Sequence, residues 1–271
     1  MKLGFIGAGR MADAILRGLI SSGDFSKNNM IISDKDIARS KQVSKKYDVG
    51  VAQNNAEAAG GSDVIVLAVK PQSMHSVLSE LAGKLGSSQL VISIAAGITL
   101  KSMEKYLAKV PVVRVMPNNP CLIGEGISAI CGGKFAQEKD LKTAEKIFSC
   151  VGDTMRVEEK QMNAVTALSG SGPAFIYEVI DALVDGGIEE GLSKSLSSAL
   201  ALKTALGSIK TVIKTKISPE ELKNMVASPG GTTVAGLRVL EEAKFKGALK
   251  KAVIKASARA KEISEDFEKS L

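Results

Sequence analysis

The first part of the chain, up to about residue 156, alternates short apolar runs with longer amphipathic segments. The apolar runs are residues 3–6, 30–32, 64–69, 90–94, 110–115, 127–130 and 154–157. The segments with helical periodicity between them lie near residues 11–22, 37–46, 73–85, 100–107 and 138–148. Strands this apolar, separated by helices, belong to a mostly parallel sheet that is covered on both faces. The pattern therefore predicts a doubly wound α/β domain over residues 1–156.

After about residue 161 the strand signals stop and helical periodicity takes over. Helices are expected near residues 175–183, 195–213 and 220–225. An apolar stripe follows at spacings of mostly three or four, through Leu237, Leu240, Leu249, Val253, Ala256, Ala260, Ile263 and Phe267. The stripe fits either subunit packing or an internal core. We expect an all-helical second domain over residues 157–271, with the linker around residues 153–161.

The composition fits a soluble enzyme or binding protein. Hydrophobic residues make up 45% and charged residues 24% of the 271 residues, which is ordinary for a globular protein. The formal net charge of +7 indicates either a solvated lysine-rich surface or a field that attracts anionic ligands. Lysines spread over the whole chain, with aromatics at only 4%, argue against a nucleic-acid surface.

Other classes of site and location are disfavoured. Cys121, Cys131 and Cys150 are odd in number and lack metal-ligand spacing, which favours the reducing cytoplasm over a disulfide framework. No zinc or calcium pattern appears, so no metal is expected. His75 is the only histidine and has no partner in a recognisable triad. The apolar runs are too short for a signal peptide or a membrane span of about 18 residues.

A glycine-rich turn follows the first apolar run and opens the first helical segment. Gly7 permits a tight turn, Gly9 lets backbone N–H groups reach a pyrophosphate, and Ala12 allows close helix packing. The helix N-terminus adds partial positive charge for the phosphates. This context predicts that the first domain binds a dinucleotide.

The end of the second strand is the place where such domains distinguish NAD from NADP. Asp34 can accept hydrogen bonds from ribose hydroxyls, which favours NAD. Ser33, Lys35 and Arg39 can donate to a 2′-phosphate, and Arg10 adds nearby positive charge, which favours NADP. The sequence leaves this choice open.

Three further turns are expected at the same edge of the sheet. Residues 68–71 and 93–97 contain small side chains against which a nicotinamide and its ribose can lie. Residues 116–120, with two prolines and two asparagines, offer amides for hydrogen bonding. Each segment can also be an ordinary turn, but together they outline one cleft.

Two glycine-rich segments lie in the helical region. Residues 169–173, Ser-Gly-Ser-Gly-Pro, fit a helix start and also a serine-rich helix N-terminus aimed at an anionic ligand. Residues 228–233, Ser-Pro-Gly-Gly-Thr-Thr, are costly to order and add nothing to a helical core. The second segment predicts a loop that a small ligand approaches closely.

These motifs, in this order, resemble the pyrroline-5-carboxylate reductase family over almost the whole chain. The matching segments are GFIGAGRMADAI, AVKPQ, SIAAGI, RVMPNNP, NAVTALSGSGPAF and VASPGGTTVAGLRVLE, the last two being the most specific. The resemblance implies an oxidoreductase that reduces 1-pyrroline-5-carboxylate to L-proline in proline biosynthesis, using NADPH or NADH, with NADPH slightly favoured. It also implies a homodimer with interlocked helical domains, able to assemble into a decamer, with the substrate at the subunit junction.

The resemblance also assigns site residues by position. The cofactor-binding residues are expected to be Gly7, Ala8, Gly9, Arg10, Met11, Ser33, Asp34, Lys35, Asn55, Ala68, Val69, Lys70, Pro71, Ala95, Ala96 and Gly97. The substrate-binding residues are expected to be Ser171, Ser228, Gly230, Gly231, Thr232 and Thr233. Backbone N–H groups of Thr232 and Thr233 are expected to bind the substrate carboxylate. The Thr233 hydroxyl is expected to be the catalytic group, holding or protonating the ring nitrogen.

Three positions depart from the family pattern. Asn119 replaces threonine in the usual Asn-Thr-Pro, Arg10 stands where asparagine is frequent, and Asn224 replaces an acidic residue. These departures bear on specificity and rate, not on the reaction class.

Two other functions fit the same plan less well. A hydroxyacid dehydrogenase needs a proton donor such as lysine at the start of the helical domain, and residues 169–192 contain no lysine. A nucleotide sensor without catalytic activity has no use for a second small-molecule loop beside the cofactor.

Overall fold

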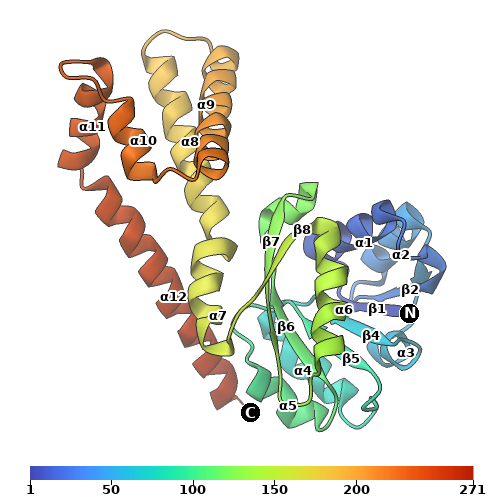
Figure 1. The fold of residues 1–271 in the computed structure, drawn as a ribbon. Coiled ribbons are helices and arrows are strands. Elements are labelled where there is room, and N and C mark those ends of the chain that lie inside the picture. The colour runs from blue at the N-terminus through green and yellow to red at the C-terminus, as the bar shows by residue number, and fades with distance from the viewer. Residues whose placement is uncertain (271) are drawn as a thin grey trace. The chain divides into compact units, whose positions relative to one another are not determined.

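A computed structural model describes residues 1–270 (Figure 1). Its strands are β1 (Leu3–Ile6), β2 (Met30–Ser33), β3 (Gly50–Val51), β4 (Val64–Leu67), β5 (Leu90–Ser93), β6 (Val112–Met116), β7 (Gly126–Gly132) and β8 (Gly152–Arg156). The helices up to residue 165 are α1 (Arg10–Ser22), α2 (Ile37–Tyr47), α3 (Asn55–Gly60), α4 (Pro71–Leu81), α5 (Leu100–Leu107), α6 (Glu138–Phe148) and α7 (Met162–Val165). The later helices are α8 (Gly172–Glu189), α9 (Lys194–Thr215), α10 (Pro219–Met225), α11 (Thr232–Glu242) and α12 (Phe245–Lys269).

The strands form one sheet in the order β3-β2-β1-β4-β5-β6-β7-β8. Neighbouring strands are parallel except β6 and β7, which are antiparallel. The predicted doubly wound, mostly parallel sheet followed by helices is therefore confirmed. β3 and α3 were not predicted, because a strand of 2 residues and a helix of 6 residues carry too little periodicity to be recognised.

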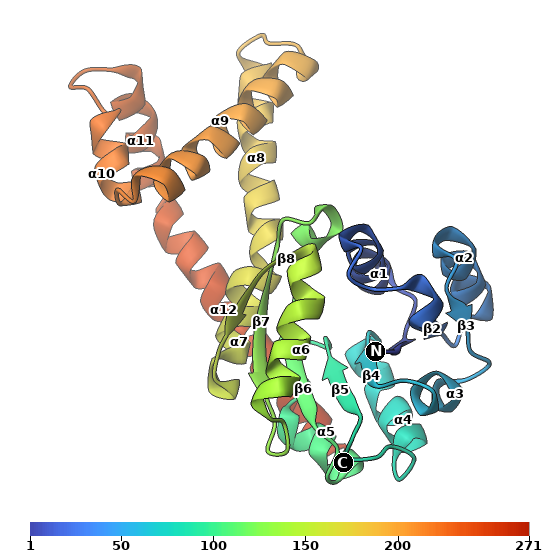
Figure 2. The same cartoon turned by 45° about the vertical axis from the view of Figure 1, so that its right-hand side comes forward.

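Helices cover both faces of the sheet, because the strands carry apolar side chains on both faces and these must be buried. On one face, the alternate strand residues Leu3, Phe5 and Val66 pack with α1, α2 and α6. On the other face, Ile65 and Leu67 pack with α3, α4 and α5. Figure 2 shows α6 lying across the part of the sheet that contains β6 and β7. Because these helices lie on the faces of the sheet, the carboxyl ends of β1, β2 and β4 at its edge can line a site.

The contacts within the chain divide it into two compact units. One unit contains Met1–Ser171 together with the chain from Ile254 onward, and the other contains Gly172–Val253. The start of α12 thus belongs to the second unit and its end to the first. The domain boundary expected between residues 156 and 157 stays a prediction. The periodicity of apolar residues locates helices and strands but not the contacts between them.

Ala108, directly after α5, has a backbone conformation that favours glycine. Its φ is 48° and ψ is −113°, and the turn closes with the Val110 N–H donating to the Leu107 carbonyl oxygen at 2.9 Å. This is the first central position of a type II′ turn, which is normally glycine.

Ala108→Gly is therefore expected to raise the free energy of unfolding by about 1 kcal/mol, measured by urea denaturation. Ala82→Gly is the matched control, since Ala82 is also exposed, also follows a helix, and has a φ of −56°. There glycine only adds freedom to the unfolded chain, so the control is expected to lose stability. Equal losses in both variants would contradict the strain assigned to Ala108.

Candidate active site

The glycine turn between β1 and α1 is held by its backbone. Gly7 has a φ of +105°, and its N–H donates to the Ser33 carbonyl oxygen at 2.8 Å. A Cβ at Gly7 would press against the carbonyl oxygen of Ala68. Gly9 caps α1 without a side-chain hydrogen bond, and apart from Gly9 and its chain neighbours no heavy atom of residues 1–270 lies within 4 Å of the position that a Cβ would take there. The turn therefore leaves N–H groups of the helix start open to an anion.

A cavity of about 650 Å³ opens beside this turn. The predicted cofactor residues that line it are Gly7, Gly9, Asp34, Lys35, Asn55, Ala68, Val69 and Lys70. The other residues that line it are Ile6, Arg39, Gln72, Ser73, Ser76 and Val77. The residues from α4 in the second set were missed, because the spacing of α4 indicates only which face of the helix is buried. We call this space the dinucleotide cavity.

Hydrogen bonds fix the side chains at the end of β2. The Asp34 carboxylate accepts from the Ala8 N–H at 2.7 Å and from the Asp36 N–H at 2.9 Å. The Ser33 hydroxyl, which the sequence offers to a 2′-phosphate, is only 2% exposed and instead donates to Asn55 Oδ1 at 2.8 Å. The Asn55 amide in turn donates to Glu80 Oε2 at 2.7 Å. Ser33 and Glu80 thus orient the amide of Asn55 at the cavity wall.

The exposed cations at this edge are left for a ligand. Arg39 lies 3.9 Å from Asp36, with side chains 53% and 50% exposed. Lys35 and Lys70 are exposed and make no ion pair among residues 1–270. Solvent-exposed guanidinium and ammonium groups in a cavity that also offers free backbone N–H groups suit a phosphorylated ligand.

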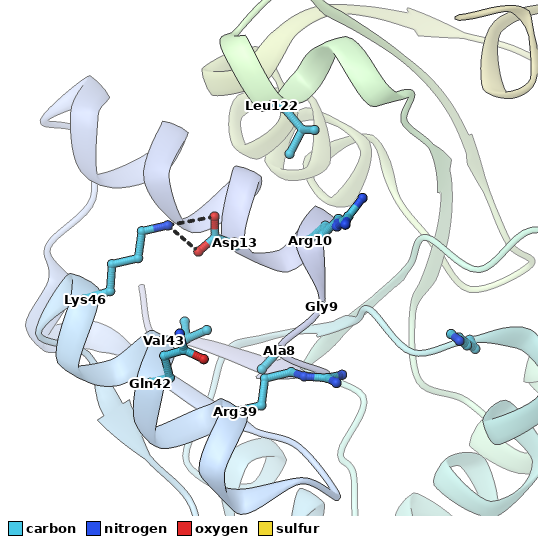
Figure 3. A pocket seen from close by; sticks show the side chains of 10 residues that line it. Ala8, Gly9, Arg10, Asp13, Arg39, Gln42, Val43, Lys46 and Leu122 are labelled. Carbon is cyan, nitrogen blue, oxygen red and sulfur yellow. Dashed lines mark hydrogen bonds and ion pairs between the residues drawn. The ribbon is translucent and has the colours of Figure 1, made fainter. Parts of the chain in front are cut away.

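A second cavity, of about 530 Å³, lies between α1 and α2 (Figure 3). It contains two more of the predicted cofactor residues, Ala8 and Arg10, and it shares Gly9, Arg39 and Lys70 with the dinucleotide cavity. The predicted cofactor residues that line neither cavity are Met11, Ser33, Pro71, Ala95, Ala96 and Gly97.

Gly97 has a structural reason for being small. Its φ is +77°, and a Cβ there would come within 2.5 Å of Cγ2 of Ile263 in α12. The neighbouring Thr99 hydroxyl donates to Glu268 Oε1, also in α12, at 3.1 Å. The loop after β5 therefore packs against the end of α12, a contact that the sequence did not reveal.

One of the two side-chain amides predicted in the turn after β6 bonds to the protein backbone. Asn118 is 9% exposed, and its Oδ1 accepts from the Ile127 N–H at 3.0 Å. This bond fixes the start of β7 to the turn, so the Asn118 carbonyl has a structural role.

Residues 169–173 do not start a helix. The backbone is helical from α7 through a π-helical turn, Thr166–Gly170, into α8, and Ser171 has helical angles. The Ser169 hydroxyl donates to the Val165 carbonyl oxygen at 2.9 Å, and the Ser171 N–H donates to the Thr166 carbonyl oxygen at 2.9 Å. The expectation of a free N-terminus was wrong, because the glycines here accommodate a wider helical turn. Such turns are frequent at functional sites.

Residues 228–233 form a tight turn followed by the start of α11. The Gly231 N–H donates to the Ser228 carbonyl oxygen at 3.0 Å, and Gly230 has a φ of +73°. Proline and glycine at the two central positions of such a turn are typical of type II. Gly231 caps α11 without a side-chain hydrogen bond. Thr232 and Thr233 are the first two residues of α11, so their N–H groups have no partner within the helix and are available to a carboxylate.

Helices α8 and α9 expose many apolar side chains. The exposed ones are Ile176, Tyr177, Leu183, Ile188, Leu196, Leu200, Leu202, Leu206, Ile209 and Ile213, and Leu192 in the turn between the two helices is exposed as well. By length and composition alone α9 is apolar enough to cross a membrane, with a mean hydropathy of 1.2, although its apolar residues form no unbroken run of about 18. Exposed apolar side chains gathered on two neighbouring helices are typical of protein association.

Comparison with known proteins accounts for both the cavity and the apolar helices. Residues 159–263 match the family model for pyrroline-5-carboxylate reductase dimerisation, and residues 2–97 match that for NADP oxidoreductase, coenzyme F420-dependent. The exposed face of α8 and α9 therefore lies within a dimerisation domain, which favours subunit packing over a membrane.

Curated relatives and solved structures cover nearly the whole chain. The pyrroline-5-carboxylate reductase of Methanosarcina acetivorans is 46% identical over 97% of both chains, and that of Arabidopsis thaliana is 39% identical over 97% of this chain and 96% of its own. The structure of Plasmodium falciparum pyrroline carboxylate reductase with NADP bound has a TM-score of 0.88 at 36% identity, covering 97% of this chain and 98% of its own. The Streptococcus pyogenes enzyme has a TM-score of 0.90 at 32% identity with the same coverage. The chain belongs to the pyrroline-5-carboxylate reductase family.

Proposed function

We propose that this protein reduces 1-pyrroline-5-carboxylate to L-proline with NADPH or NADH, as a cytoplasmic enzyme of proline biosynthesis. The observation that carries the proposal is the identity of 46%, over 97% of the chain, to a reductase of this name. The three cysteines are free, as a reducing compartment requires.

The dinucleotide cavity fits the cofactor. Gly9 leaves room for a pyrophosphate beside the open start of α1, and Asn55 is held ready at the wall of the cavity. Lys70 and Arg39 add positive charge near the phosphates. When bound, the reduced nicotinamide supplies the hydride. The residues around the cavity bind and orient it, and orientation alone lowers a barrier by several kcal/mol.

The start of α11 fits the substrate. N–H groups of Thr232 and Thr233 bind the carboxylate of the cyclic imine, and the turn that includes Ser228, Gly230 and Gly231 brings backbone close to it. The Thr233 hydroxyl holds the ring nitrogen. Ser171, beside the π-helical turn, is a further contact of the substrate in this proposal.

The reaction needs little acid–base chemistry. The protonated imine is electrophilic at carbon, so it accepts the hydride there and its C=N π electrons become a lone pair on nitrogen. The nitrogen keeps its proton and thus becomes the secondary amine of proline. The task of the protein is alignment and a hydrogen bond to nitrogen, which Thr233 supplies.

NADPH is the favoured cofactor in this proposal. The Asp34 carboxylate, which would select ribose hydroxyls, already accepts two backbone hydrogen bonds. Lys35 and Arg39 stand exposed beside it and suit a 2′-phosphate.

Lys35→Met and Arg39→Met are each expected to lower kcat/KM for NADPH about tenfold, the lower end for a hydrogen bond to a charged group. The value for NADH is expected to change less than about twofold, because NADH lacks the 2′-phosphate. Lys41→Met is the matched control, an exposed lysine of α2 outside both cavities. Equal losses with both cofactors would contradict the assignment.

The experiment that tests the function is steady-state kinetics with pyrroline-5-carboxylate and each reduced cofactor, with proline identified as product. Absence of proline formation with both cofactors would reject the proposed function.

The assembly proposed is a homodimer with interlocked helical domains, which can form a decamer. The exposed apolar faces of α8 and α9 support it. Light scattering of the full chain measures the mass of the assembly.

A further inference from the structure

The loop that follows β5, residues 94–99, lies on the nicotinamide side of the proposed cofactor site. The sheet order places β2 on one side of β1 and places β4 and then β5 on the other side. A dinucleotide crosses the carboxyl edge of such a sheet with its pyrophosphate at the turn after β1. In the proposed function Lys35 and Arg39, which follow β2, bind the 2′-phosphate of the adenosine half. The nicotinamide half therefore extends over β4 toward this loop, which we call the β5 loop.

The β5 loop rests on the last turns of α12, and both belong to the same compact unit. Gly97 has a φ of +77°, and a Cβ there would come within 2.5 Å of Cγ2 and 3.0 Å of Cβ of Ile263. Ala95 and Ile98 are only 4% and 0% exposed, and Phe267 of α12 packs against the core cluster that contains them. Because no space is left between the helix and the loop, α12 determines where the loop lies.

A hydrogen bond from the end of the β5 loop to α12 adds to this packing. The Thr99 Oγ1 accepts from the Ser102 N–H at 3.2 Å and so caps α5, while the Thr99 hydroxyl donates to Glu268 Oε1 at 3.1 Å. A carboxylate can only accept, so Glu268 fixes the direction of the hydroxyl proton. The next N–H, that of Leu100, donates to Glu159 Oε1 at 3.1 Å. Carboxylates from two distant segments thus hold the point where the loop enters α5.

We propose that Ile263 and Glu268 are positioning residues that hold the β5 loop in place for the nicotinamide half of the cofactor. They act through Gly97 and Thr99 and touch neither cofactor nor substrate. The inference rests on the proposed function, because the loop has a nicotinamide to hold only if the protein binds the dinucleotide. NADPH binding by the unaltered protein tests that function separately.

The test compares two ligands by calorimetry on the full-length protein. NADPH has both halves of the dinucleotide, whereas adenosine 2′,5′-bisphosphate has the adenosine half with its 2′-phosphate and no nicotinamide. Glu268→Ala is expected to weaken NADPH binding about fivefold, the middle of the range for one hydrogen bond, and to change bisphosphate binding less than about twofold. A general loss of structure would weaken the binding of both ligands.

Two further variants at glutamates of α12 isolate the hydrogen bond. Glu268→Gln keeps an oxygen that accepts from the Thr99 hydroxyl, so it is expected to retain most of the affinity for NADPH. Glu265→Ala is the matched control, because Glu265 is also exposed and its carboxylate pairs with Lys261 of the same helix at 3.6 Å. It is expected to leave the binding of both ligands unchanged.

A second pair of variants tests the packing against Gly97. Ile263→Ala removes Cγ2, the atom nearest to the loop, and is expected to weaken NADPH binding at least as much as Glu268→Ala does. Ile263→Val keeps a methyl group at that position and is expected to bind NADPH nearly as well as the unaltered protein.

Two results would overturn the inference. One is NADPH binding that Glu268→Ala and Ile263→Ala both leave unchanged. The other is an equal weakening of NADPH and of adenosine 2′,5′-bisphosphate, which would mean that these substitutions disturb the whole unit and not the nicotinamide half of the site. Because Glu268 is exposed, its alanine variant is expected to fold and to decide between these results even if Ile263→Ala does not fold.

Discussion

Gly7→Ala is expected to lower the free energy of unfolding by about 2–5 kcal/mol and to weaken NADPH binding about 100-fold. Two costs combine at this position. A φ of +105° is unfavourable for alanine, and the new methyl group would press on the carbonyl oxygen of Ala68. Because that oxygen belongs to backbone held beside β1 by the Ala68 N–H bond to Ile6 at 2.8 Å, it has little room to move.

The loss of NADPH binding has the same cause, because relieving the contact with Ala68 displaces the backbone of the turn. Ala8 and Gly9 follow Gly7 directly and carry backbone that faces the phosphates in the proposed function. A shift of about 1 Å in a positioning group is enough for a loss of about 100-fold. Urea denaturation measures the stability, and the enhancement of cofactor fluorescence measures the Kd for NADPH.

Gly23→Ala separates the two costs. Gly23 follows α1 with a φ of +76°, and apart from Gly23 and its chain neighbours no heavy atom in the described part of the chain lies within 4 Å of the position that a methyl group would take there. It therefore suffers the backbone strain alone, about 1–2 kcal/mol, and NADPH binding is expected to be unaffected. Equal decreases in the free energy of unfolding of the two variants would mean that the contact between the new methyl group and Ala68 does not destabilise the fold.

The features that the sequence predicted well are local ones. The turn at Gly7 and Gly9, and the polar residues that follow β2, adjoin apolar runs whose burial is clear from composition alone. Each parallel strand ends at the same edge of the sheet, so residues 34, 35 and 68–70 meet without any knowledge of side-chain contacts. This is why most of the residues of the dinucleotide cavity could be predicted.

The features that the sequence did not reveal depend on distant partners. Gly97 is small because Ile263 of α12 lies against it, and the Ser33 hydroxyl is occupied by Asn55. Both partners are far away along the chain, and periodicity says nothing of them. The prediction of a helix start at residues 169–173 was wrong for another reason. Glycine and proline signal a helix start far more often than a widened turn inside a helix.

Thr233→Ala is expected to lower kcat/KM for pyrroline-5-carboxylate about 10- to 150-fold, the range for a hydrogen bond to a charged group. The backbone N–H groups at the start of α11 remain. In the proposed site the carboxylate therefore still binds, and only the contact with the ring nitrogen is lost. The Kd for NADPH is expected to stay the same. Thr233→Ser keeps the hydroxyl and is the matched control, with most of the activity expected to remain.

The division of the loss between kcat and KM tests what the hydroxyl does. In the proposed site its bond to nitrogen aligns the imine carbon for hydride transfer, so the loss is expected mainly in kcat, with KM changing little. A loss confined to KM would mean that Thr233 binds the substrate equally before and during the reaction, and it would remove the catalytic role assigned to its hydroxyl. An unchanged kcat/KM would remove Thr233 from the site altogether. Because the alanine and serine variants differ by one oxygen atom, either result is attributable to the hydroxyl rather than to the fold of α11.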